Sequence, residues 1–213
     1  MLNPEFESFR HFCFDLDGTL LDSYPVMEES WESCRERFSL EPSFEDYKRL
    51  TGRPFGNILK ALKIQDKIGA IERAYFEETQ RLSAASDLHA DVLDLLNAIE
   101  AGNSSWSIVT GKPRAQTVGV CDRLGLTPQL LVCGDDFHFG KPDARLGELV
   151  ANFFRVELNS VIYFGDTLVD YLFAINSGFS YCHCDFGGYG PVPSGLHPYP
   201  TSIGAWNEVL REQ

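Results

Sequence analysis

The chain has 213 residues and a formal net charge of -13, with 31 acidic residues against 18 Lys and Arg residues. Nucleic-acid-binding proteins usually present a basic surface, so we expect neither nucleic acid nor an anionic membrane as a partner. No run approaches the roughly 18 apolar residues of a membrane span, and the N-terminus lacks the pattern of a secretory signal, so we expect a cytoplasmic protein.

The first predicted strand spans residues 11–14 and is followed at once by Asp15, Asp17 and Gly18. Side chains two positions apart on an extended segment point the same way, so Asp15 and Asp17 are expected to face one site. Two neighbouring carboxylates repel each other unless a cation or a proton lies between them. This pattern favours a magnesium ion, which takes oxygen ligands. For this segment alone, a strand that merely ends in an acidic turn is the alternative.

The next segment, from about residue 23 to residue 88, contains no convincing strand and several amphipathic stretches. It predicts a small helical bundle inserted after the first strand. The helices are expected at residues 26–37, 44–50, 56–62 and 67–82. We therefore predict an α/β core domain made of residues 1–22 and 89–213, and an all-helical cap domain made of residues 23–88.

The rest of the chain alternates short apolar runs with helical stretches, which predicts a Rossmann-like parallel sheet with helices on both faces. Further strands are expected at residues 106–109, 130–133 and 161–164, with a weaker one at 179–183. Helices are expected at residues 90–100, 114–124, 144–154 and 168–176. Residues 187–191 read as a loop, and a short final helix is expected near residues 202–210.

Polar residues follow each of the later strands, where parallel sheets of this kind bind their ligands. Thr110 and Gly111 offer a hydroxyl and backbone amides to phosphate oxygens, and Lys141 offers a positive charge. Asp166 and Asp170, four positions apart, can share one face at a helix start. The alternatives are a solvated surface lysine and carboxylates that only favour the helix dipole.

Four segments in this order resemble the signature of the haloacid dehalogenase superfamily, in its branch with a helical cap. They are DLDGTLLDS at residues 15–23, IVTGK at 108–112, GKPD at 140–143 and FGDTLVD at 164–170. The first and last are most similar to those of phosphoglycolate-phosphatase-like members. The chain departs from the family pattern in having Gly111 after the threonine and Ala144 after the lysine segment, and neither change removes a charged group.

The resemblance assigns catalytic roles to residues of this chain. Asp15 would attack phosphorus, and Asp17 would protonate the leaving oxygen and later activate water. Thr110, the backbone of Gly111 and Lys141 would bind the phosphoryl group. Such a site positions the reactants and neutralises charge, as phosphoryl transfer requires.

The resemblance also implies a magnesium cofactor and a specificity residue. Asp15, Asp17 through its carbonyl, and Asp166 would ligate Mg²⁺, with Asp170 in support. Arg53, in a loop of the predicted cap, would contact an anionic leaving group, and a solvated arginine is the alternative.

The function implied is magnesium-dependent hydrolysis of a small phosphate monoester through an aspartyl-phosphate, with a small phosphorylated metabolite as the substrate. Two alternatives remain open: a phosphomutase of the beta-phosphoglucomutase type, and a non-catalytic binding protein that retains the fold. A halide-releasing dehalogenase fits less well, because it does not need Asp17 and Asp166 for acid–base work and metal binding. The chain is expected as a monomer or homodimer.

Overall fold

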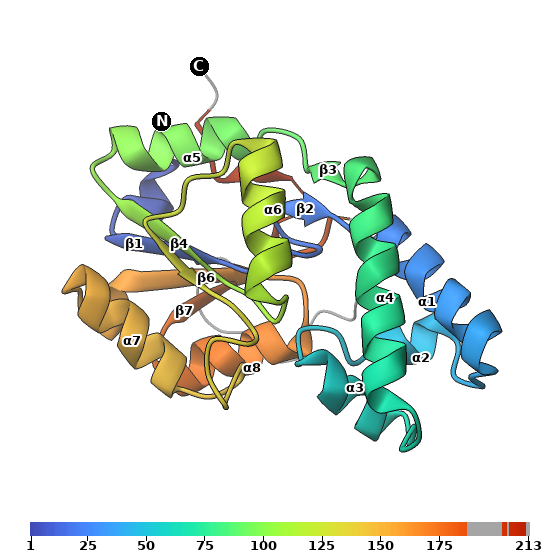
Figure 1. Ribbon diagram of the computed structural model, residues 1–213. Helices are drawn as coiled ribbons and strands as arrows, with labels where there is room; N and C mark the ends of the chain where they lie inside the picture. The colour runs from blue at the N-terminus through green and yellow to red at the C-terminus, as the bar shows by residue number, and fades with distance from the viewer. Residues whose placement is uncertain (187–201, 204, 212–213) are drawn as a thin grey trace.

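The computed structural model describes residues 1–186, 202–203 and 205–211, and a parallel sheet lies at its centre (Figure 1). The strand order is β5-β4-β1-β6-β7-β8, and every neighbouring pair is parallel. The strands are β1 (His11–Phe14), β4 (Ser105–Val109), β5 (Leu130–Val132), β6 (Val161–Gly165), β7 (Ser180–Cys184) and β8 (Ser202–Ile203). All five predicted strands are confirmed, and the central position of β1 places Asp15 between the ends of its neighbours.

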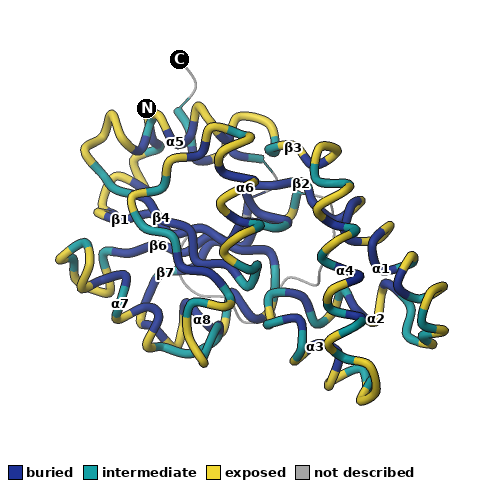
Figure 2. Tube along the Cα trace, viewed as in Figure 1, coloured by how far each residue is buried: buried dark blue, intermediate teal, exposed yellow. Residues whose placement is uncertain are grey.

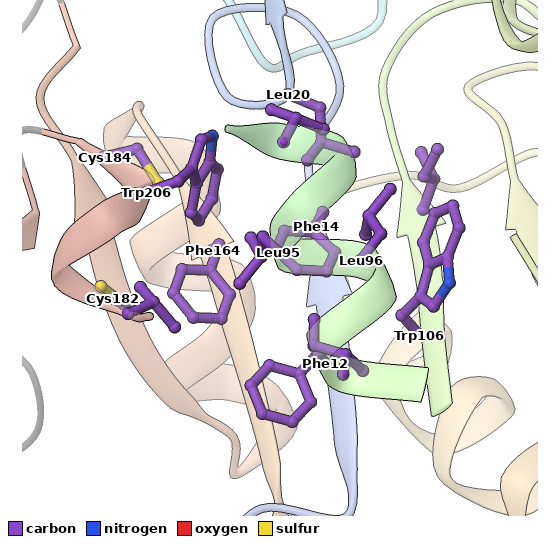
Figure 3. Close-up of a cluster of buried hydrophobic side chains, with 14 of the residues drawn as sticks. Phe12, Phe14, Leu20, Leu95, Leu96, Trp106, Phe164, Cys182, Cys184 and Trp206 are labelled. Atoms are coloured by element: carbon purple, nitrogen blue, oxygen red, sulfur yellow. The ribbon is translucent and has the colours of Figure 1, made fainter. Parts of the chain in front are cut away.

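Two hydrophobic clusters cover the two faces of the sheet, because successive side chains of each strand point to opposite faces. Phe12 and Phe14 pack with helix α5 (Val92–Ala101) and helix α6 (Arg114–Leu124) on one face. Figure 3 shows this cluster, in which Phe14 and Phe164 lie beside Leu95 of α5. Cys13 faces the other side, where α7 (Arg145–Phe154) and α8 (Leu168–Ser177) pack. The predicted helices on both faces are therefore confirmed.

The segment after β1 forms four helices with a separate hydrophobic cluster, at the right of Figure 1. They are α1 (Tyr24–Phe38), α2 (Phe44–Lys48), α3 (Phe55–Ala61) and α4 (Ile68–Leu82). Where the chain enters and leaves this bundle, β2 (Leu21–Asp22) and β3 (Asp87–Leu88) pair antiparallel. Figure 2 shows exposed positions along the outer sides of these helices. The separate hydrophobic cluster of the bundle supports the predicted division into a core domain of residues 1–22 and 89–213 and a cap domain of residues 23–88. This division stays a prediction.

The C-terminal part differs from the expectation. Residues 202–203 form β8 at the sheet edge, and the only helical turn near residues 202–210, within the described part, is a 3₁₀ turn at Trp206–Glu208. Ile203 pairs with Cys184, and Trp206 packs on Phe14 and Phe164, so contacts with the sheet replace the predicted helix. The predicted loop at residues 187–191 lies outside the described residues.

Three further 3₁₀ turns complete the regular elements of the described residues, at Pro4–Phe6, Ser83–Ala85 and Leu158–Ser160. None of the described helices combines the length and the apolar character that crossing a membrane requires.

Candidate active site

Asp15 and Lys141 meet in the interior at the carboxyl end of β1. The Asp15 amide donates a hydrogen bond to the carbonyl of Phe164 (2.9 Å), which continues the pairing of β1 with β6. Lys141 Nζ lies 2.8 Å from Asp15 Oδ1 and 2.6 Å from Asp170 Oδ1, and it donates to the Tyr163 hydroxyl at 3.0 Å. Lys141 is only 5 % exposed, so the alternative of a solvated surface lysine is wrong.

Asp15, Asp166 and Asp170 form a buried carboxylate cluster, with one oxygen of each within 4.8 Å of the others. Loss of solvent raises the pKa of Asp15 to about 7; Lys141 opposes this shift and Asp170 adds to it. Burial, followed by the charges of Asp170 and Asp15, raises the pKa of Asp166 well above its usual value. Three carboxylates held this closely and shielded from water are destabilising unless positive charge is nearby.

The donor set of this cluster fits a divalent cation. Hard cations such as Mg²⁺ bind carboxylate oxygens and dehydrate reluctantly. Asp15 Oδ1 is fully buried and makes an ion pair with Lys141, but no well-aligned hydrogen bond engages it. One lysine faces three carboxylates here, so the cluster of Asp15, Asp166 and Asp170 can hold a metal ion.

Adding Mg²⁺ is expected to stabilise the protein, and more so at high pH. A ligand at about 100 times its Kd adds about 2.7 kcal/mol to the free energy of unfolding. For a chain of this length that raises Tm by about 5–10 °C. The pKa of Asp15 is raised to about 7, so below that pH a proton competes with the cation, and the increment should be smaller at about pH 5.5 than at about pH 8.

Differential scanning fluorimetry in MgCl₂ and in EDTA measures this increase in Tm. Asp166→Asn, which removes one charged ligand, should lose most of it. An unchanged increment in that variant, or none in the wild type at either pH, would contradict the proposed metal site.

Asp170 serves both as part of the cluster and as a helix cap. It forms a capping box with Thr167 at the start of α8, in which each residue bonds the amide of the other. Asp170 Oδ1 meanwhile contacts Lys141. Asp170 therefore caps α8, as the helix-terminus alternative expects, and also lies beside Lys141.

Asp17 does not belong to this carboxylate cluster. It lines a neighbouring cavity, where Lys112 Nζ lies 2.9 Å from both of its carboxylate oxygens. Its side chain is not among the described metal-binding groups, so its predicted metal contact rests on its carbonyl oxygen alone. The predicted role of residues 110–112 rested on a hydroxyl and backbone amides and did not include the Lys112 ammonium. Lys112 lies three residues after the end of β4, at the same sheet edge as Asp17, and this position is the signal that could have revealed it.

Gly18 begins the turn that follows Asp17. Its φ of +78° lies in the left-handed region that favours glycine, and an added Cβ would lie 2.3 Å from Asp166 Oδ2. Any other residue would therefore strain the backbone and displace a carboxylate of the cluster.

Two residues that were not predicted for the site donate hydrogen bonds to Asp166. Tyr24 of α1 donates to Asp166 Oδ2 at 2.6 Å, and Thr19 donates to Asp166 Oδ1 at 3.1 Å. Burial, and then the charge of Asp166, raises the pKa of Tyr24 well above its usual value, so this hydroxyl stays a donor. The helical bundle thereby contributes a hydrogen bond to the carboxylate cluster.

Two of the three predicted phosphate-binding residues, Thr110 and Gly111, line one small cavity of about 60 Å³ between the bundle and the sheet. Asp15, Asp17, Thr110 and Gly111 line it from the sheet side, and Arg53 lines it from the loop between α2 and α3. Lys141, Asp166 and Asp170 are not among its lining residues and lie behind Asp15. The predicted residues thus form two adjoining groups, one that lines the cavity and one buried behind Asp15, and Asp15 belongs to both.

The chain is similar in sequence to known proteins. The protein family described as haloacid dehalogenase-like hydrolase matches residues 12–183. An N-acetylmuramic acid 6-phosphate phosphatase of Pseudomonas putida is 30 % identical over 169 residues, which cover 76 % of each chain. A phosphoglycolate phosphatase of Agrobacterium fabrum is 28 % identical over 193 residues, covering 84 % of this chain and 82 % of that protein.

Solved structures show the same fold. A hydrolase from Pseudomonas syringae superposes with a TM-score of 0.77 at 24 % identity, covering 85 % of this chain and 87 % of its own. A haloacid dehalogenase-like family protein of Streptococcus pneumoniae gives a TM-score of 0.72 at 19 % identity, covering 86 % and 92 %. With the family match over residues 12–183, the conclusion is plain: this chain belongs to the haloacid dehalogenase-like hydrolase family.

Proposed function

We propose that the protein is a magnesium-dependent phosphatase that hydrolyses a small phosphate monoester through an aspartyl-phosphate on Asp15. The observation that carries this proposal is the position of Asp15. Its carboxylate opens onto the cavity and is backed by Lys141 and by two further carboxylates that can hold a metal ion. The relatives named as phosphatases support the same class of reaction.

The first step forms a bond between an Asp15 carboxylate oxygen and phosphorus. The bond from phosphorus to the leaving oxygen breaks, its electron pair stays on that oxygen, and Asp17 supplies the proton. Lys112 contacts both Asp17 oxygens at the cavity, and this contact must open so that Asp17 can take up, from solvent, the proton that it then donates to the leaving oxygen. Splitting the displacement in this way replaces one difficult step by two easier ones.

The second step releases phosphate. Asp17, now ionised, takes a proton from a water molecule, whose oxygen attacks phosphorus, and the bond to Asp15 breaks. Thr110, Gly111 and Lys141 are proposed to hold the phosphoryl oxygens during both steps. When bound by Asp15, Asp166 and Asp170, Mg²⁺ would neutralise the negative charge that the phosphoryl group brings into the site.

Assaying the purified protein against a panel of phosphorylated metabolites tests this proposal. Phosphate release is expected with Mg²⁺ and not with EDTA, because the carboxylates otherwise repel an anionic substrate. Release that does not depend on metal would contradict the metal site, sugar-phosphate isomerisation without release would indicate the phosphomutase, and no turnover would indicate a binding protein. Arg53, which is exposed at the cavity, is proposed to influence substrate preference, and an Arg53→Ala variant that affects all substrates equally would refute that role.

A further inference from the structure

A second cavity, of about 310 Å³, lies beside the catalytic one. Residues of α1 and α4 line it on the bundle side and residues of α6 line it on the sheet side. Helices α4 and α6 are neighbours in the ribbon of Figure 1. Small-molecule sites usually measure roughly 300–1,000 Å³, so this cavity reaches the usual size and the catalytic cavity of about 60 Å³ does not. A substrate that fills only the catalytic cavity would be very small.

The two cavities share four lining residues, Met27, Thr79, Lys112 and Gln116, and therefore adjoin one another. Lys112 is the residue that holds Asp17, the proposed proton donor to the leaving oxygen. The leaving group must extend from phosphorus on the side that Asp17 protonates. It is thus directed toward Lys112, at the junction of the two cavities.

The walls of the second cavity carry both hydroxyl and amide groups and apolar groups. Ser83 and Gln80 on the bundle side and Gln116 on α6 can each donate and accept hydrogen bonds. Val26 and Val120 add apolar surface. Walls of this kind suit a group that carries several hydroxyls on a carbon skeleton.

The charged residues of these walls already have partners. Lys112 and Arg123 are the only charged side chains among the described residues that line the second cavity. Lys112 is paired with Asp17, and Arg123 donates to the Ser86 carbonyl at 2.6 Å and lies 3.8 Å from Asp87. A carboxylate or second phosphate on the leaving group would therefore be buried there without a dedicated cation, which is costly.

We propose that the second cavity receives the leaving group of the substrate, and that this group is an uncharged, polyhydroxylated one of sugar size. The inference rests on the proposed phosphatase function and names its substrate class. It predicts that a hexose 6-phosphate is a better substrate than phosphoglycolate, whose leaving group is small and carries a carboxylate.

Gly119→Leu tests the inference, because it fills the second cavity from α6. A Cβ at Gly119 meets nothing within 4 Å, and leucine favours a helix interior over glycine, so the variant should fold. We expect kcat/KM for glucose 6-phosphate to fall about tenfold or more, the effect of blocking roughly 1.4 kcal/mol of binding, with phosphoglycolate unchanged within about twofold. Gly56→Leu on α3 is the matched control, since its Cβ also meets open space and Gly56 lines neither cavity.

Ser83→Leu narrows the same cavity from the bundle side and should show the same selective loss if Gly119→Leu is poorly folded. Equal losses for both esters in these variants, no loss for glucose 6-phosphate, or a wild-type preference for phosphoglycolate would each overturn the inference while leaving the phosphatase function intact. A wild-type protein that releases phosphate from no ester in the presence of Mg²⁺ would instead overturn the proposed function itself.

Discussion

Asp15→Asn is expected to abolish turnover of every substrate, because an amide oxygen cannot serve as the nucleophile that forms the aspartyl-phosphate. Removing a nucleophile of this kind lowers kcat by roughly 10⁴-fold or more. Acid-quenched wild-type enzyme, after mixing with labelled substrate, should carry phosphate that hydroxylamine removes, and the variant should carry none. Turnover near the wild-type rate, or labelled phosphate on the variant, would refute Asp15 as nucleophile.

The same variant should not lose stability, which separates a chemical defect from misfolding. Burial raises the pKa of Asp15 from 3.8 to about 7, so the folded protein holds a proton that the unfolded chain has released between these values. The ionised carboxylate therefore destabilises the fold progressively as pH rises through this window, and asparagine removes that cost. In EDTA at about pH 8 the variant should be at least as stable as the wild type, because Lys141 keeps its buried ion pair with Asp170. Asp122→Asn, at an exposed position on α6, is the control that should change neither property.

Lys141→Met should destabilise the metal-free protein strongly and lower activity. Burial alone would lower the pKa of Lys141, but its ion pairs with Asp15 and Asp170 raise it above its ordinary value, so the side chain is charged. Removing one partner of a buried ion pair costs about 3–5 kcal/mol, because the remaining charges lose their compensation. Urea unfolding in EDTA measures the loss, and kcat/KM should fall by about a hundredfold or more.

The pH dependence of that loss identifies its cause. Lys141 lowers the pKa of Asp15, so in its absence the carboxyl stays protonated to higher pH. The loss of stability should therefore be large at about pH 8 and shrink toward about pH 5, where protons replace the missing cation. Lys60→Met, at an exposed position on α3, should change stability by less than about 0.5 kcal/mol. A Lys141 variant as stable as the wild type at high pH would show that the ammonium is not needed to compensate these carboxylates.

The parallel sheet, the helical insert and the residues that end the strands can all be predicted from the amino-acid pattern. Short apolar runs bounded by Asp15, Thr110 and Asp166 mark buried strands locally, and parallel strands present their carboxyl ends at one edge. Residues that follow different strands therefore had to converge, whatever the details of packing. This is why Asp15 and Asp166 could be placed at one site before their distance was known.

Which side chains contact one another at this edge of the sheet depends on the tertiary structure. The pairing of Lys112 with Asp17, the hydrogen bond from Tyr24 to Asp166 and the burial of Trp206 in place of a final helix each join segments far apart in the chain. Such contacts depend on how the helical bundle and the C-terminal segment pack on the sheet, and no local pattern records that packing. The second cavity beside the catalytic one exists for the same reason, because its walls come from α1, α4 and α6, which only the fold brings together.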